Sequence, residues 1–144
     1  MGRALVLVGH GSARNPHTKK PLCDAADEIR RRGVFDEVRV GFLKEDSRIC
    51  KTLEPLESEE ITVVPFFIAD GYYTREVIPC CLGKNRNADS RNIRTTRAVG
   101  SHPRFAHLLL RHARDAGWQP GDALVVLGHG TPKNPASGFN VYLQ

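Results

Sequence analysis

The sequence contains no long apolar run. None of its apolar stretches approaches the roughly 20 residues that a membrane-spanning helix needs. The first such stretch, residues 4–8, is too short and wrongly flanked to be the core of a secretory signal peptide. These absences predict a soluble protein of the cytoplasm.

The sequence also lacks closely spaced cysteine pairs of the C-x-x-C kind. Its four cysteines stand at positions 23, 50, 80 and 81. A bridge between the adjacent Cys80 and Cys81 would be strained, so we expect reduced thiols rather than a disulfide framework. A metal or cluster role for Cys80 or Cys81 stays open, because thiolates are metal ligands.

A recognisable nucleic-acid module is missing as well, although the formal net charge is +5. Basic residues are not interleaved with aromatic ones, so nucleic acid is not the expected partner. A positive balance still favours an anionic ligand such as a phosphate or a polycarboxylate. With 144 residues, the chain has room for one domain of ordinary size and little more.

Short apolar runs alternate with helical patterns along the chain. Continuous rather than alternating runs are typical of parallel strands that are covered on both faces. The expected strands are 4–8, 38–43, 61–68 and 93–99. The expected helices are 21–33, a short one after 46, one near 74–82 that Pro79 interrupts, and 103–117. This order predicts an α/β fold: a three-layer, doubly wound parallel sheet of about four strands, with ligands at the strands' carboxyl ends.

One segment of the sequence occurs twice. Residues 4–16 read A-L-V-L-V-G-H-G-S-A-R-N-P, and residues 123–135 read A-L-V-V-L-G-H-G-T-P-K-N-P. The repeat predicts one domain over 1–119, then the first strand and loop of a truncated second copy over 120–144. We therefore expect a piece of a longer tandem protein. The second apolar strand should pair with an edge of this domain's sheet or of another molecule's.

The repeated motif Gly-His-Gly-Ser/Thr follows a strand in both copies. Flanking glycines let the backbone turn and leave the imidazole of His10 open to a ligand. Histidine can then act as base, nucleophile or metal ligand, and His129 stands in the same setting. The loop that follows can offer amide N–H groups, Ser12 and Arg14 to an anion. A structural histidine bonded to a neighbouring loop is the alternative.

The segment after the third strand should emerge at the same edge as His10. It carries Asp70, Tyr72, Tyr73 and Arg75, with Thr74 as the expected helix cap. Tyrosines that merely pack on the end of the sheet are the simpler interpretation.

Glu45 and Asp46 follow the second strand at that edge too. Their carboxylates could bind a metal ion or accept a proton. An acidic helix start explains them equally simply.

Three motifs in order resemble one protein family. They are G-H-G-S at 9–12, V-P-F-F-I-A-D-G-Y-Y-T-R-E-V-I-P at 64–79, and V-G-S-H-P-R-F-A-H-L-L-L-R-H at 99–112. Together they resemble the small sirohydrochlorin chelatases, the CbiX type of class II chelatases, from residue 4 to about 116 and again from 123. The resemblance implies a lyase that inserts cobalt or ferrous iron into sirohydrochlorin or a related tetrapyrrole. It also implies a second such domain, in the same longer chain or in a homodimer.

The resemblance places the family's first metal-binding histidine on His10, and on His129 in the second copy. The family's second histidine falls on Tyr73, and Lys44 stands where an acidic residue is common, with Glu45 one step on. The implied site therefore has His10 as catalytic base and ligand, with Glu45 and His129 as further metal ligands. We interpret it as a modified or shared metal site.

The residues expected to bind substrate surround His10. The implied macrocycle is flat, with carboxylates at its rim, so aromatic and cationic side chains suit it. The residues expected to bind substrate are one serine, two tyrosines and two arginines: Ser12, Arg14, Tyr72, Tyr73 and Arg75. The divalent metal is a substrate, and no organic cofactor is expected.

Three other functions were compared with metal insertion. A non-catalytic scaffold that binds metal or tetrapyrrole would explain Tyr73 and Lys44. A histidine phosphatase is disfavoured because Gly9 precedes His10 where those enzymes carry arginine. Dinucleotide binding is disfavoured because G-H-G-S lacks the third glycine of G-x-G-x-x-G.

Overall fold

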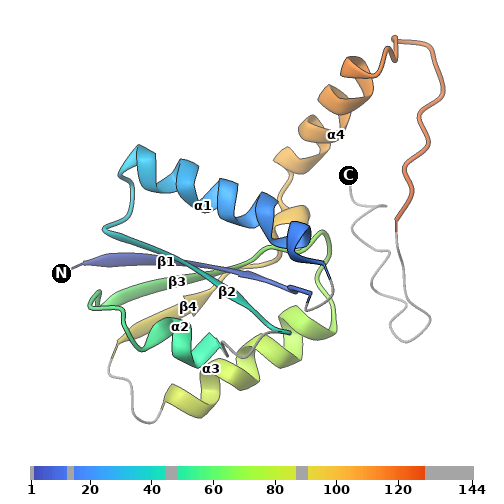
Figure 1. The fold of residues 1–144 in the computed structure, drawn as a ribbon. Helices are drawn as coiled ribbons and strands as arrows, with labels where there is room; N and C mark the ends of the chain where they lie inside the picture. Colours follow the sequence, from blue (N-terminus) through green and yellow to red (C-terminus); the bar gives the residue numbers. More distant parts are fainter. Residues whose placement is uncertain (1, 13–14, 45–48, 87–90, 129–144) are drawn as a thin grey trace.

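A four-stranded, wholly parallel sheet forms the centre of the molecule. The computed structural model describes residues 2–12, 15–44, 49–86 and 91–128 (Figure 1). The sheet order is β2-β1-β3-β4. Its strands are β1 (Arg3–Gly9), β2 (Glu37–Phe42), β3 (Glu60–Pro65) and β4 (Asn92–Thr95). The predicted doubly wound α/β fold is confirmed.

Helices cover both faces of this sheet, as Figure 1 shows. On one face, α1 (Lys20–Arg32) packs Leu22 and Ala26 against alternate residues of β1. On the other face lie α2 (Ile49–Leu53) and α3 (Ile78–Arg86), which bury Ile49, Leu53, Ile78 and Leu82. Residues 4–8 of β1 are therefore all buried, which explains their continuous apolar run.

The first helix begins and ends where the sequence predicts. A short 3-10 turn, η1 (Pro16–Lys19), leads into it, and Pro21 lies in its first turn, where the missing N–H costs no hydrogen bond. Gly33 ends the helix with φ 62°, a left-handed conformation that glycine adopts without strain. Its N–H donates to the Arg30 carbonyl at 3.1 Å.

The segment after β3 differs from the expectation. The strand ends at Pro65 rather than at residue 68, and the Phe66 N–H makes the last bond to the Val8 carbonyl, at 2.7 Å. A π-helical turn, η2 (Tyr73–Val77), leads directly into α3, where Pro79 lies in the first turn and breaks nothing. The prediction that Thr74 caps this helix is wrong, because Thr74 lies inside η2.

The last helix has the predicted position but not the expected packing. α4 (Arg104–Asp115) follows the short turn η3 (Val99–Ser101), and none of its residues is buried. Figure 1 shows α4 leaving the sheet instead of covering it. β4 also ends early, at Thr95 instead of residue 99.

The second apolar run does not join the sheet. Residues 123–128 have no strand conformation, and the side chain of Leu127 is 90% exposed. The expectation that this run pairs with an edge of this domain's own sheet is therefore wrong for residues 123–128. No helix in the described ranges is long and apolar enough to cross a membrane.

Candidate functional site

An open cavity of about 820 Å³ lies at the carboxyl ends of β1 and β2. β1 lies between β2 and β3 in the sheet, and the chain continues from β1 to β2 on one side. Doubly wound sheets bind ligands at such a position, where the order of the strands reverses. The cavity wall includes His10, Ser12, Leu22, Phe42, Lys44 and Phe66. The structure thus places two of the predicted site residues, His10 and Ser12, on the wall of this cavity.

The two glycines beside His10 lie in close contact with their neighbours, and the backbone conformation requires glycine at position 11. Gly11 has φ 71°, and a Cβ there would lie 2.9 Å from the Phe42 Cβ. A Cβ on Gly9 would lie 2.8 Å from Leu22 Cδ2, at the start of α1. Both contacts are shorter than real Cβ atoms show. At Gly11 the contact is with the first side-chain atom of a β2 residue, so a side chain there would push the strand away, whereas at Gly9 it is with the end of a flexible side chain that can move aside.

His10 is held by a hydrogen bond and a ring contact. Its Nδ1 lies 3.0 Å from the Gly11 carbonyl oxygen. Because a carbonyl only accepts, this bond requires a proton on Nδ1, and in the neutral ring Nε2 then keeps its lone pair. The Tyr73 ring lies edge-on at 89°, with its centroid 4.9 Å from that of the imidazole.

Tyr73 belongs to an aromatic group beside His10. Its ring stacks on Phe67 at 6.0 Å and meets Tyr72 edge-on at 5.6 Å. Tyr72 itself is 59% exposed, and Arg75 is also exposed. Of the predicted substrate-binding residues after β3, the structure therefore brings Tyr73 to His10 and leaves Tyr72 and Arg75 at the surface.

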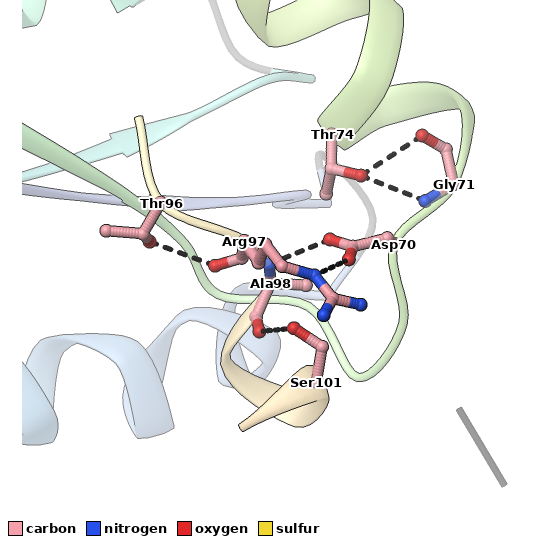
Figure 2. A network of polar contacts seen from close by, with 7 residues as sticks. All are labelled: Asp70, Gly71, Thr74, Thr96, Arg97, Ala98 and Ser101. Carbon is pink, nitrogen blue, oxygen red and sulfur yellow. Dashed lines mark hydrogen bonds and ion pairs between the residues drawn. The ribbon is translucent and has the colours of Figure 1, made fainter. Parts of the chain in front are cut away.

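Buried Asp70 anchors the loop that carries these aromatic rings. Its Oδ2 accepts from Arg97 Nε at 2.9 Å, and its Oδ1 accepts from the Ala98 N–H at 2.8 Å, as Figure 2 shows. In the same figure the Thr74 hydroxyl bonds both the N–H and the carbonyl of Gly71. Asp70 is therefore a structural carboxylate in this fold, which sequence reasoning could not distinguish from a ligand.

Lys44 is the cavity residue that sequence reasoning left without a role in binding. Its N–H donates to the His10 carbonyl at 3.0 Å, because β2 and β1 end side by side. A second cation lies nearby, with Lys19 Nζ 5.5 Å from the centroid of the Phe42 ring. In the sequence, the only sign that Lys44 would lie near His10 was that both of their strands were expected to end at the same edge of a parallel sheet.

Three predicted site residues, Arg14, Glu45 and His129, lie outside the described residues. Within the described ranges, no group of three or more histidine, cysteine, aspartate or glutamate side chains is placed to hold a metal ion. Cys23, Cys80 and Cys81 form no disulfide.

Sequence comparison relates this chain to chelatases. A family model described as CbiX matches residues 4–116. A protein of Halobacterium salinarum named "Probable sirohydrochlorin cobaltochelatase" is 36% identical over 97% of this chain and 56% of its own length. The sirohydrochlorin cobaltochelatase of Methanococcus maripaludis is 38% identical over 56% of this chain and 58% of its own length. The chain thus spans little more than half the length of these relatives.

Solved structures share the fold. The sirohydrochlorin chelatase SirB from Bacillus subtilis subspecies spizizenii, in complex with cobalt, superposes with a TM-score of 0.70 at 18% identity. The match covers 80% of this chain and 51% of SirB. A multi-domain protein from Deinococcus radiodurans with structural similarity to chelatases gives a TM-score of 0.68 at 28% identity, covering 83% of this chain and 30% of that one.

Proposed function

This chain belongs to the CbiX family, and from that premise we propose that it inserts a divalent metal ion into sirohydrochlorin or a related tetrapyrrole. Cobalt and ferrous iron are the candidate metals, and the names of the relatives favour cobalt. The observation that carries the proposal is the placement of His10 on the wall of an open cavity.

His10 is the proposed catalytic base and metal ligand. Metal insertion requires the loss of pyrrole N–H protons and a ligand that releases the metal to the macrocycle. With Nδ1–H donated to Gly11, Nε2 carries the one free lone pair, so it would hold the metal first and accept one pyrrole proton after the metal has left, while the second proton passes to solvent. A single imidazole leaves most coordination positions of the metal open to the incoming nitrogens.

The substrate side of the site is proposed from ring and charge chemistry. The flat macrocycle would lie near the aromatic group of Phe67, Tyr72 and Tyr73, whose rings are already in mutual contact. Ser12 would bind the macrocycle from the cavity wall, and Arg14 and Arg75 would bind the carboxylates at the rim of the macrocycle.

A second chelatase-like domain, in the same longer chain or in a homodimer partner, would complete the site. The repeat at 123–135 and the uncovered face of α4 support this proposal. Such a domain would bring His129 into use, while Glu45 would add a carboxylate from this one. The proposed place of the reaction is the cytoplasm.

A non-catalytic scaffold is the second candidate. Tyr73, which stands where the resemblance places a second histidine, lies beside His10, and Lys44 adds a cation to the cavity wall. The scaffold would bind metal or tetrapyrrole without turnover.

The deciding experiment compares the whole chain with His10→Ala and with His107→Ala, whose histidine is exposed on α4. Each protein is mixed anaerobically with sirohydrochlorin and Co²⁺ or Fe²⁺, and insertion is followed by absorption. We expect insertion above the uncatalysed rate, unchanged in His107→Ala and lowered roughly 100-fold in His10→Ala, the size of a lost general base. A wild-type rate equal to the blank would mean that this chain alone is not a chelatase, and the same assay on the longer tandem chain would then decide between a shared site and the scaffold.

A further inference from the structure

Lys44 and His10 share one wall of the cavity. Their backbones are joined by the 3.0 Å bond from the Lys44 N–H to the His10 carbonyl, which fixes the residue that leaves β2 beside the residue that leaves β1. Any ligand that reaches His10 from the cavity therefore also meets the region around Lys44.

The wall around these two residues combines apolar surface with positive charge. Leu22, Phe42 and Phe66 supply the apolar part. The described residues that line the cavity include no aspartate or glutamate. Within the same part of the chain, Lys44 forms no ion pair with a carboxylate, whereas Lys20, Arg30 and Arg97 each do.

We infer that Lys44 binds a carboxylate of the macrocycle and selects acidic tetrapyrroles over neutral or cationic ones. The inference rests on the proposed function, because it assigns a specificity-determining residue to the same cavity. An ammonium group is a compact charge with three donors, so it can follow a carboxylate on a flexible side chain. The apolar wall would contact the part of the ring that extends from His10 into the cavity, and Lys44 recognises the acidic rim of that part.

The test uses uroporphyrin, a metal-free porphyrin with only acidic side chains, as the binding probe. The whole chain and its Lys44→Gln, Lys44→Arg and Lys51→Gln variants are titrated by fluorescence. Lys51 is an exposed lysine of α2 and serves as the matched control. We expect Lys44→Gln to bind roughly three- to tenfold more weakly, with a shallower dependence on salt, as for loss of a charge-assisted contact. Lys44→Arg and Lys51→Gln should bind as the wild type does.

A cationic porphyrin separates charge recognition from cavity shape. If Lys44→Gln weakens both porphyrins equally, or leaves uroporphyrin binding unchanged, the inference is overturned. Insertion of cobalt by the wild type is measured in parallel and reports on the proposed function alone. Selective weakening without any cobalt insertion would support the role of Lys44 and refute metal insertion by this chain alone. Cobalt insertion by the wild type, together with unaltered uroporphyrin binding by Lys44→Gln, would support the chelatase and refute the role of Lys44.

Discussion

His10 is oriented by two contacts of different kinds. The Gly11 carbonyl fixes the tautomer, and the edge of the Tyr73 ring limits rotation of the imidazole. The hydrogen bond is local to the motif, whereas the ring contact depends on a residue about sixty positions later in the chain. The orientation of His10 therefore depends on how the loop after β3 is held.

Tyr73 should act on the reaction through its ring rather than its hydroxyl. We expect Tyr73→Phe to insert metal at the wild-type rate, and Tyr73→Ala to be roughly two- to tenfold slower, the range expected for one aromatic contact. Insertion rates at saturating macrocycle measure the effect separately from macrocycle affinity. A wild-type rate in Tyr73→Ala would mean that the imidazole is oriented without this ring.

Glu37 gives one part of the fold a dependence on pH. Its Oε1 accepts from the Ser58 hydroxyl at 2.7 Å, from the Ser58 N–H at 2.9 Å and from the Glu57 N–H at 3.0 Å. These bonds, the Ser58 hydroxyl first, hold the pKa of Glu37 below its ordinary value. Stabilisation by a carboxylate with a lowered pKa is present above its unfolded-state pKa and is lost as the pH falls through its folded-state pKa.

We therefore expect Glu37→Gln to lower the free energy of unfolding at pH 7 by up to about 1 kcal/mol, because solvent screens the half-buried group. At an acidic pH below this lowered pKa, where the wild-type carboxyl also gains its proton, the difference should shrink. Urea unfolding at both pH values measures it, with the exposed Glu59→Gln as control. An equal difference at both pH values would show that charge is not the cause.

At the scale of elements, the loop after β3 is held by η3. The Gly100 N–H donates to the Phe67 carbonyl at 2.9 Å, and a Cβ on Gly100 would overlap the Ile68 carbonyl oxygen. Asp70 adds its two bonds to Arg97 and Ala98 (Figure 2). The loop after β3 and η3 approach so closely that no side chain fits between them. This packing holds the aromatic group beside His10.

Gly100→Ala tests this packing. We expect it to destabilise the fold by roughly 1–3 kcal/mol, the usual cost of overpacking, and to slow metal insertion by moving the loop. Gly83→Ala is the matched control, because nothing lies within 4 Å of its Cβ in α3 and alanine favours a helix. Thermal unfolding by circular dichroism measures both. If Gly100→Ala were as stable as Gly83→Ala, the close approach would have no energetic importance.

Elements marked by local chemistry were predictable from the sequence, and those set by distant contacts were not. Pro21 and Gly33 bound α1 through their own backbone preferences, and the motif around His10 carries its own glycines. By contrast, β3 stops at Pro65, short of apolar residues that continue the run, because the following segment bonds to η3 instead of a strand. Thr74 was expected to cap the helix because the sequence does not reveal the π-helical turn, which makes the helical segment begin one residue before Thr74.

At the scale of the whole molecule, apolar surface gathers on one side. α4 and the run 123–128 line a groove of about 430 Å³ with Ile68, which is itself 68% exposed. The apolar stripe of α4 was predictable from the spacing of its residues. The position of the helix was not, because the spacing indicates that one face needs a partner but does not identify that partner. A contiguous exposed apolar surface of this kind marks an interaction site.

We expect the 144-residue chain to self-associate through this surface in a concentration-dependent manner. Leu127→Lys should shift it toward the monomer without affecting the fold, because the side chain is 90% exposed and a buried ammonium would be costly at the contact. Val34→Lys introduces the same charge at an isolated, 51% exposed apolar residue far from the groove in sequence, so it should associate as the wild type does. Light scattering after size exclusion measures the mass of each. Equal masses for the wild type and Leu127→Lys at every concentration would mean that residues 123–128 take no part in association, and the partner of α4 would then have to bind the helix alone.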